Sequence, residues 1–148
     1  MTDTNNQTSQ IQYIREAQEI SSGMNSSLLI YILSYFFMPL FFLSIPKAYK
    51  LAFRAQKLLE AAGKNDASLE AEAVYKQQKL KWNLLLGLIF GGFGMGILAW
   101  ILPNEIGYYV GLLYGVFSLV SLFFFIYADV TALKKRLSIK AAIDEIGG

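Results

Sequence analysis

The stretch LLLGLIFGGFGMGILAWIL, residues 84–102, contains no charged residue and is almost wholly apolar. A second run of the same kind, residues 106–128, follows after the short segment Pro103-Asn104-Glu105. Each run has the ~18–20 residues that a helix needs to cross a hydrocarbon layer of ~30 Å. A soluble helix of this length shows charges on its outer face. The two runs therefore predict transmembrane helices over residues 83–102 and 106–129, joined by an extracytoplasmic turn at residues 103–105.

Residues 28–45 form a third uncharged run, and we expect a Pro-kinked transmembrane helix over residues 27–46. Pro39 lies at its middle and Pro46 at its end, and each proline removes a backbone donor and bends a helix. The same prolines also fit a re-entrant hairpin, which would put the N-terminus on the inner side. Because the first 26 residues hold only one basic residue, Arg15, we favour the spanning helix. The fold class is thus an all-α integral membrane protein with three transmembrane helices.

Lysine and arginine are distributed unevenly among the segments between the runs. One lies before the first run, eight lie in residues 47–81, none lies in residues 103–105 and four lie in residues 134–140. Cytoplasmic segments of membrane proteins carry the excess of basic residues. The counts therefore predict an N-terminus outside and a C-terminus inside, and we expect a bacterial cytoplasmic membrane.

The segments outside the runs differ in character. Residues 47–82 are rich in good helix formers, and Gly63 is placed to end a helix, so we expect a basic cytoplasmic antiparallel helical hairpin. Its second helix is expected to continue into the span as one helix over residues 66–101. Residues 1–26 are polar and predict a flexible extracytoplasmic segment. Residues 130–148 predict a basic amphipathic cytoplasmic tail, which lies along the membrane interface or docks on the hairpin.

Basic side chains of the hairpin and tail make up the predicted cytoplasmic basic surface. Its members are Lys47, Lys50, Arg54, Lys57, Lys76, Lys79, Lys81, Lys134, Lys135 and Arg136. We interpret this surface chiefly as a topology signal, with recognition of anionic lipid or an acidic partner as the alternative. No run of basic residues is dense enough to predict a nucleic-acid site.

Eight of the twelve glycines lie in the runs at residues 84–102 and 106–128. Small residues four apart make a groove that lets two helices approach closely in a membrane. The predicted helix-packing residues are Gly87, Gly91, Gly92, Gly96, Gly107, Gly111 and Gly115. Two alternatives stay open: the glycines pack the two helices of one chain together, or one row faces another subunit.

The composition excludes much enzyme chemistry. The chain has no Cys and no His, which removes thiolate nucleophiles, zinc sites of the usual kind and imidazole bases. The runs hold no charged residue of the sort that marks proton relays or ion sites. We expect no enzyme activity, catalytic residue, cofactor, metal or small-molecule substrate. The expected partners are the lipid bilayer and another membrane protein or a second copy, as for an accessory subunit or a homo-oligomer.

Two resemblances suggest alternatives. Three spans with the N-terminus outside and the C-terminus inside resemble the layout of phage holins, which implies a small homo-oligomeric pore. The stretch from Phe41 through Gly63 to residues 79–83 is similar to the dispanin family over about a third of the chain. That resemblance implies a membrane-dipping first segment and a role in membrane remodelling. The third span is additional here, and Gly63 lies farther from the following span than the family pattern has it.

Overall fold

A computed structural model describes the backbone of residues 2–148 and the side chains of residues 6–148. The described chain is helical almost throughout and has no strand, which confirms the all-α prediction. Its elements are α1 (Thr2–Phe36), the short 3-10 helix η1 (Met38–Leu40), α2 (Phe41–Ala61), α3 (Asn65–Ile101) and α4 (Asn104–Gly147).

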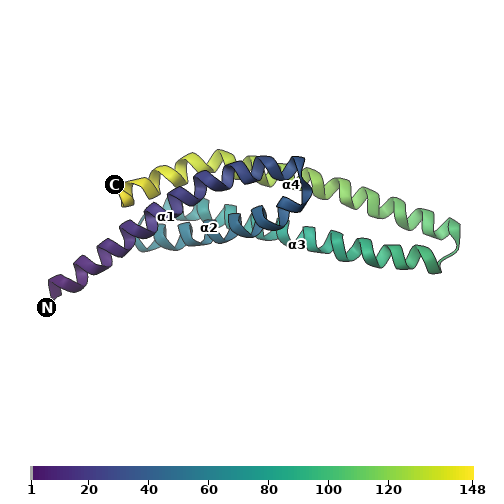
Figure 1. The fold of residues 1–148 in the computed structure, drawn as a ribbon, viewed down its shortest axis with the longest axis horizontal. Helices are drawn as coiled ribbons and strands as arrows, with labels where there is room; N and C mark the ends of the chain where they lie inside the picture. The colour runs from purple at the N-terminus through teal and green to yellow at the C-terminus, as the bar shows by residue number, and fades with distance from the viewer. Residues whose placement is uncertain (1) are drawn as a thin grey trace.

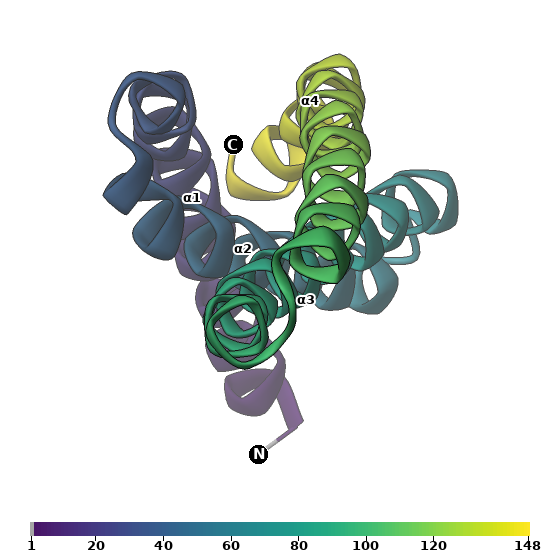
Figure 2. The same ribbon diagram turned by 90° about the vertical axis from the view of Figure 1, so that its right-hand side faces the viewer.

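The elongated molecule has two unlike halves (Figure 1). In one half α1 and α2 lie beside the first part of α3 and the last part of α4; we call this half, residues 2–83 and 129–147, the bundle. In the other half α3 and α4 run on alone to the turn at Pro103; we call this half, residues 84–128, the apolar hairpin. The view along the long axis shows α3 and α4 projecting together from the bundle (Figure 2).

Gly63 makes the turn between α2 and α3, as the sequence predicts. Its φ of +76° is a left-handed conformation that a residue with a Cβ adopts only with strain. The amide of Gly63 donates to the carbonyl of Glu60 (3.1 Å) and that of Lys64 to Leu59 (2.9 Å), the two bonds of a Schellman cap. The predicted unbroken helix over residues 66–101 is also confirmed, within α3.

The first apolar run differs from our expectation of one kinked helix over residues 27–46. Helix α1 ends at Phe36, Phe37 is extended (φ −133°, ψ 94°) and η1 leads the chain back into α2. Antiparallel contacts show the reversal: Lys47 Nζ donates to Ser26 Oγ (3.0 Å) and Arg54 to Glu19 (3.1 Å). Pro39 contributes to the break, because it has no N–H with which to continue the hydrogen bonds of α1, and it stands in the first turn of η1, where that N–H is not needed. Pro46, in contrast, lies inside α2 without ending it.

The N-terminal segment, which the sequence predicts to be flexible, is helical in the described residues. It belongs to α1, and Ala17, Ile20 and Met24 are buried at helical spacing against α2 and α4. Ser21 Oγ donates to Asp144 Oδ1 (2.7 Å), which ties α1 to the last turns of α4. The two ends of the chain thus lie toward the same end of the molecule (Figure 1).

The C-terminal tail continues α4 and docks in the bundle. Its Ile139 and Ile143 are 4% and 0% exposed and belong to one core with Leu59 of α2 and Ile20 of α1. Lys64, beside the Gly63 turn, forms an ion pair with Glu145. The sequence leaves two positions open for the tail, along the membrane interface or docked on the helical hairpin. The structure shows it docked on the helices.

Helices α3 and α4 are each long and apolar enough to cross a membrane. In their most apolar stretches only 6% and 11% of the residues are buried. These side chains are therefore largely uncovered in the single chain. The first apolar run gives no third helix of this length and hydropathy among the described residues, because it is divided between α1 and α2.

Candidate functional site

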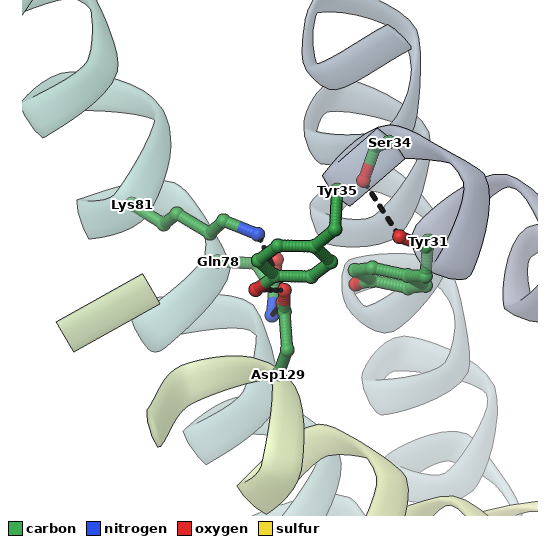
Figure 3. Close-up of polar contacts among 6 residues, drawn as sticks. All are labelled: Tyr31, Ser34, Tyr35, Gln78, Lys81 and Asp129. Carbon is green, nitrogen blue, oxygen red and sulfur yellow. Dashed lines mark hydrogen bonds and ion pairs between the residues drawn. The ribbon is translucent and has the colours of Figure 1, made fainter. Parts of the chain in front are cut away.

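A buried ion pair lies where the bundle meets the apolar hairpin. Lys81 Nζ of α3 donates to Asp129 Oδ2 of α4 at 2.7 Å, and the side chains of Lys81 and Asp129 are 0% and 9% exposed. Gln78 Nε2 donates to the other carboxylate oxygen at 3.2 Å, and the Tyr35 hydroxyl also donates to Asp129 (Figure 3). Donors from α1 and α3 thus converge on one carboxylate of α4.

Local sequence explains this arrangement. Gln78 and Lys81 are three residues apart and so lie on one face of α3. Tyr35 stands in the last turn of α1, and the reversal at Phe37 brings it beside α3 and α4. The hydroxyl of Ser34, the buried residue before Tyr35, donates to the Tyr31 carbonyl (2.6 Å), so it needs no partner outside α1 (Figure 3).

Aromatic rings enclose the ammonium group. Lys81 Nζ lies 5.0 Å from the ring centroid of Phe41, 5.4 Å from that of Phe125, and 5.7 Å from those of Tyr31 and Tyr35. Ring faces attract a cation within ~6 Å, and the attraction grows when water is excluded. The rings therefore replace part of the hydration that burial removes from Lys81. A dry pair of this kind is costly to break, because removal of one partner leaves a buried charge.

Lys81 is a correction to the predicted cytoplasmic basic surface, since it is a core residue. The exposed members are Lys47, Lys50, Arg54, Lys57, Lys76, Lys79 and Lys134, while Lys135 and Arg136 are half-buried. Several are neutralised by neighbours: Arg54 pairs with Glu16 and Glu19, Lys57 with Glu60 and Lys76 with Glu72. The surface is thus less positive than a count of basic residues indicates.

A signal for the Lys81–Asp129 pair existed in the sequence. Two helices joined by the short turn at Pro103 pair residues at similar distances from that turn, which brings Asp129 near residues 77–81. Asp129 is the first residue after the uncharged run at residues 106–128. No sequence pattern predicts that Tyr31 and Tyr35 lie beside this pair, because their positions depend on the chain reversal at Phe37.

The glycines of the apolar hairpin fall into two groups. A Cβ at Gly92 would lie 2.9 Å from the Tyr114 hydroxyl, and one at Gly91 would lie 3.4 Å from the Tyr114 ring. Tyr114 reaches across to donate to the Leu88 carbonyl, so these glycines make room within the chain. Gly107 faces the backbone of Ala99 (3.9 Å). In contrast, a Cβ would meet nothing within 4 Å at Gly87, Gly94, Gly96, Gly111 and Gly115.

The reversal between α1 and α2 forms an exposed apolar tip, which we define as residues 36–43. Phe36, Met38 and Leu43 are 86%, 69% and 65% exposed. The Phe42 ring packs edge-on against Trp82 of α3, with centroids 6.1 Å apart, and Phe41 lies near Phe125 of α4. The tip therefore lies beside the near end of the apolar hairpin and leaves most of its length uncovered.

Acidic side chains are dispersed, and the described residues hold no group of three or more that would bind a metal ion. Lys81 Nζ, Gln78 Nε2 and the Tyr35 hydroxyl all donate to Asp129, which fits a structural role for the cluster, while the buried Oε1 of Gln78 has no hydrogen-bond partner. Comparison of the chain with protein-family models, with curated protein sequences and with solved structures found no match.

Proposed function

We propose that this chain is a non-enzymatic membrane protein that acts as an accessory or interaction subunit, through helix association in the bilayer. In this proposal α3 and α4 cross the membrane over residues 84–102 and 106–128. The bundle lies on one side, with the apolar tip dipping into the adjacent leaflet. The observation that carries the proposal is the group of exposed glycines without a neighbour inside the chain.

Exposed glycines are costly in a helix. Each one lowers helix stability by about 1 kcal/mol relative to alanine, so a group of them calls for a packing reason. Intrachain packing supplies that reason for Gly91, Gly92 and Gly107 but not for Gly87 or Gly111. In lipid, small residues let a second helix approach closely, which strengthens van der Waals contact. The partner is a second copy or a transmembrane helix of another protein.

The fold supports a particular sidedness for this proposal. Both ends of the chain and the basic bundle share one side of the proposed membrane, and the turn at Pro103 lies on the other (Figure 1). Basic residues favour the cytoplasmic side. We therefore propose that both termini are cytoplasmic, with the first run as a re-entrant hairpin. Pairing of Arg54 with Glu16 and Glu19 supports a common side for α1 and α2.

Oligomeric state in mild detergent tests the proposal. We expect the full chain to purify as a defined oligomer or with a stoichiometric membrane partner. Gly94→Leu and Gly111→Leu are expected to reduce the oligomer or partner yield at least several-fold, because a large side chain separates the helices. Phe93→Leu, at an exposed non-glycine neighbour, is the matched control. A monomer without a partner, or equal association of all variants, would contradict the proposal.

Membrane remodelling is a second candidate, favoured by the apolar tip. The tip places additional apolar mass beside one end of the apolar hairpin, so in a bilayer it would widen one leaflet more than the other. We expect the protein to bind small vesicles more tightly than large ones, and Phe36→Ser with Met38→Ser to remove that preference. The pore alternative lacks such support, since Ser118 and Ser121 donate to carbonyls of their own helix.

A further inference from the structure

A cavity of about 340 Å³ lies among α1, α2 and α4 in the bundle. Its volume is in the range of small-molecule sites, and its wall is largely apolar, with Met24, Leu51 and Leu133 among the lining side chains. On α1 the lining runs from Met24 to Phe36, which is about 18 Å at the helical rise of 1.5 Å per residue. The space is thus long, narrow and apolar.

One end of the cavity opens on the apolar surface of the molecule. Ile32 and Phe36 of α1 and Ile126 of α4 line the cavity and are also 51%, 86% and 45% exposed. These residues lie toward the apolar tip and the apolar hairpin. In the proposed membrane placement the opening therefore faces the hydrocarbon of the leaflet next to the bundle.

Arg136 lines the cavity toward its other end. One guanidinium nitrogen, Nη2, donates to Asn25 Oδ1 (2.8 Å), but the buried Nε–H has no hydrogen-bond partner. A buried donor without a partner costs ~1–3 kcal/mol, so this site calls for an acceptor. Lys134 and Lys135 stand beside Arg136 in the chain and add positive charge. An anionic oxygen is the acceptor that this surrounding favours.

Asp129 also lines the cavity, and its charge must be accounted for. Lys81, Gln78 and Tyr35 donate to its two oxygens, so the carboxylate is already neutralised and hydrogen-bonded. It therefore opposes an anion at Arg136 only weakly. The cavity wall thus combines an apolar length with one cationic side chain at the end away from the opening.

We propose that this cavity binds one acyl chain of an anionic membrane phospholipid, with the phosphate accepting a hydrogen bond from Arg136. The inference rests on the proposed membrane placement. The direction of the cavity agrees with that placement. A phospholipid of the leaflet next to the bundle would have its headgroup on the bundle side, at Arg136, and its acyl chain toward the opening at Phe36. Lys47 bonded to Ser26, the residue after Asn25, adds positive charge at the headgroup level.

Native mass spectrometry of the full chain tests this assignment. The protein is reconstituted in vesicles of equal phosphatidylglycerol and phosphatidylcholine and then extracted in mild detergent. We expect one retained phospholipid per chain, with phosphatidylglycerol enriched about tenfold over phosphatidylcholine. Arg136→Gln is expected to abolish that enrichment, since it removes the charged donor. Lys134→Gln, an exposed neighbour outside the cavity wall, is the matched control and is expected to keep it.

A second variant separates loss of the site from loss of the fold. Ala52→Phe fills the cavity from α2. It is expected to abolish retention of phosphatidylglycerol and of phosphatidylcholine, and circular dichroism verifies that the helices remain. Should Ala52→Phe fail to fold, the Arg136→Gln comparison alone decides. No retained lipid, a bound free fatty acid instead, or equal binding by Arg136→Gln would overturn the assignment. Flotation of the protein with the vesicles tests the membrane placement independently, so its failure and that of the lipid site are distinguishable.

Discussion

The bundle and the apolar hairpin share helices α3 and α4, yet these helices use their side chains in opposite ways in the two halves. In the bundle, α3 and α4 bury residues such as Ala71 and Ile143 completely and present ion pairs to the outside. In the apolar hairpin they present Phe90, Phe93 and Trp100 outward, with 71%, 72% and 92% exposure. Each of the two helices thus changes along its length from burying its apolar side chains to exposing them, and Lys81–Asp129 stands at the change.

The largest expected effect comes from breaking that pair. Lys81→Met leaves Asp129 buried without its counter-ion, and we expect it to lower the free energy of unfolding by ~3–5 kcal/mol. The double variant Lys81→Met with Asp129→Leu is expected to recover most of the loss, because no unpaired charge remains.

Chemical unfolding in mild detergent, followed by circular dichroism, measures these differences. The control Lys76→Met removes an exposed pair with Glu72 and is expected to change the free energy of unfolding by less than ~1 kcal/mol. A Lys81 variant as stable as the control would show that the pair is not buried as described.

A pair of truncations compares the two halves directly. Ile143→Ala removes a fully buried side chain of the bundle and is expected to cost ~2–5 kcal/mol. Leu113→Ala removes a side chain of the apolar hairpin that is 68% exposed, and is expected to cost less than ~0.5 kcal/mol. The same unfolding measurement applies. Equal costs at both positions would contradict the division into a packed half and a half without a core.

Two glycine substitutions are expected to have opposite signs. Gly63→Ala forces a side chain onto a residue with φ of +76° and is expected to destabilise by ~1–2 kcal/mol. Gly87→Ala adds a Cβ that meets nothing within 4 Å, so in the isolated chain it is expected to stabilise α3 by up to ~1 kcal/mol. Thermal unfolding in detergent measures both. Destabilisation by Gly87→Ala in the monomer would show that Gly87 has a packing role within the chain.

The smallest effect concerns the contact between the two ends of the chain. Hydrogen bonds from Ser21 and Lys140 lower the pKa of Asp144 below its usual 3.8. A lowered folded-state pKa adds stability that is fully present above the unfolded value and is lost as the pH falls through the folded value. We therefore expect Asp144→Asn to flatten the pH dependence of stability below about pH 4, with Ser21→Ala giving part of that change. Unchanged acid profiles in both variants would show that this contact contributes nothing.

Sequence alone predicts those features of the fold that local chemistry decides. Gly63 ends α2 because of its backbone freedom, and the segment Pro103-Asn104-Glu105 separates the two apolar runs at residues 84–102 and 106–128. The reversal at Phe37 is harder to predict. Residues 28–45 are apolar throughout, and hydropathy does not distinguish a helix that crosses the membrane from a hairpin that re-enters it. The tertiary contacts of Tyr35 and Phe41 decide between them.

The candidate site was harder to predict for a related reason. Lys81 stands among Lys76 and Lys79, which are exposed, and nothing in its neighbourhood sets it apart. Its burial depends on Asp129, 48 residues later in the chain, and on rings that the α1–α2 reversal supplies. The cavity beside Arg136 likewise arises from the gap between helices that are distant in sequence.

Labelling of single cysteines in sealed, oriented vesicles tests the central claim most directly, since the chain has no native cysteine. Ser22→Cys, Asn65→Cys, Asn104→Cys and Gly148→Cys place one thiol at exposed positions of α1, the Gly63 turn, the Pro103 turn and the C-terminus. With a membrane-impermeant maleimide outside, we expect residues 22, 65 and 148 to label together and residue 104 to label only from the opposite side. Labelling of residue 22 from the same side as residue 104 would contradict the re-entrant hairpin, and labelling of all four from one side would contradict the spanning hairpin.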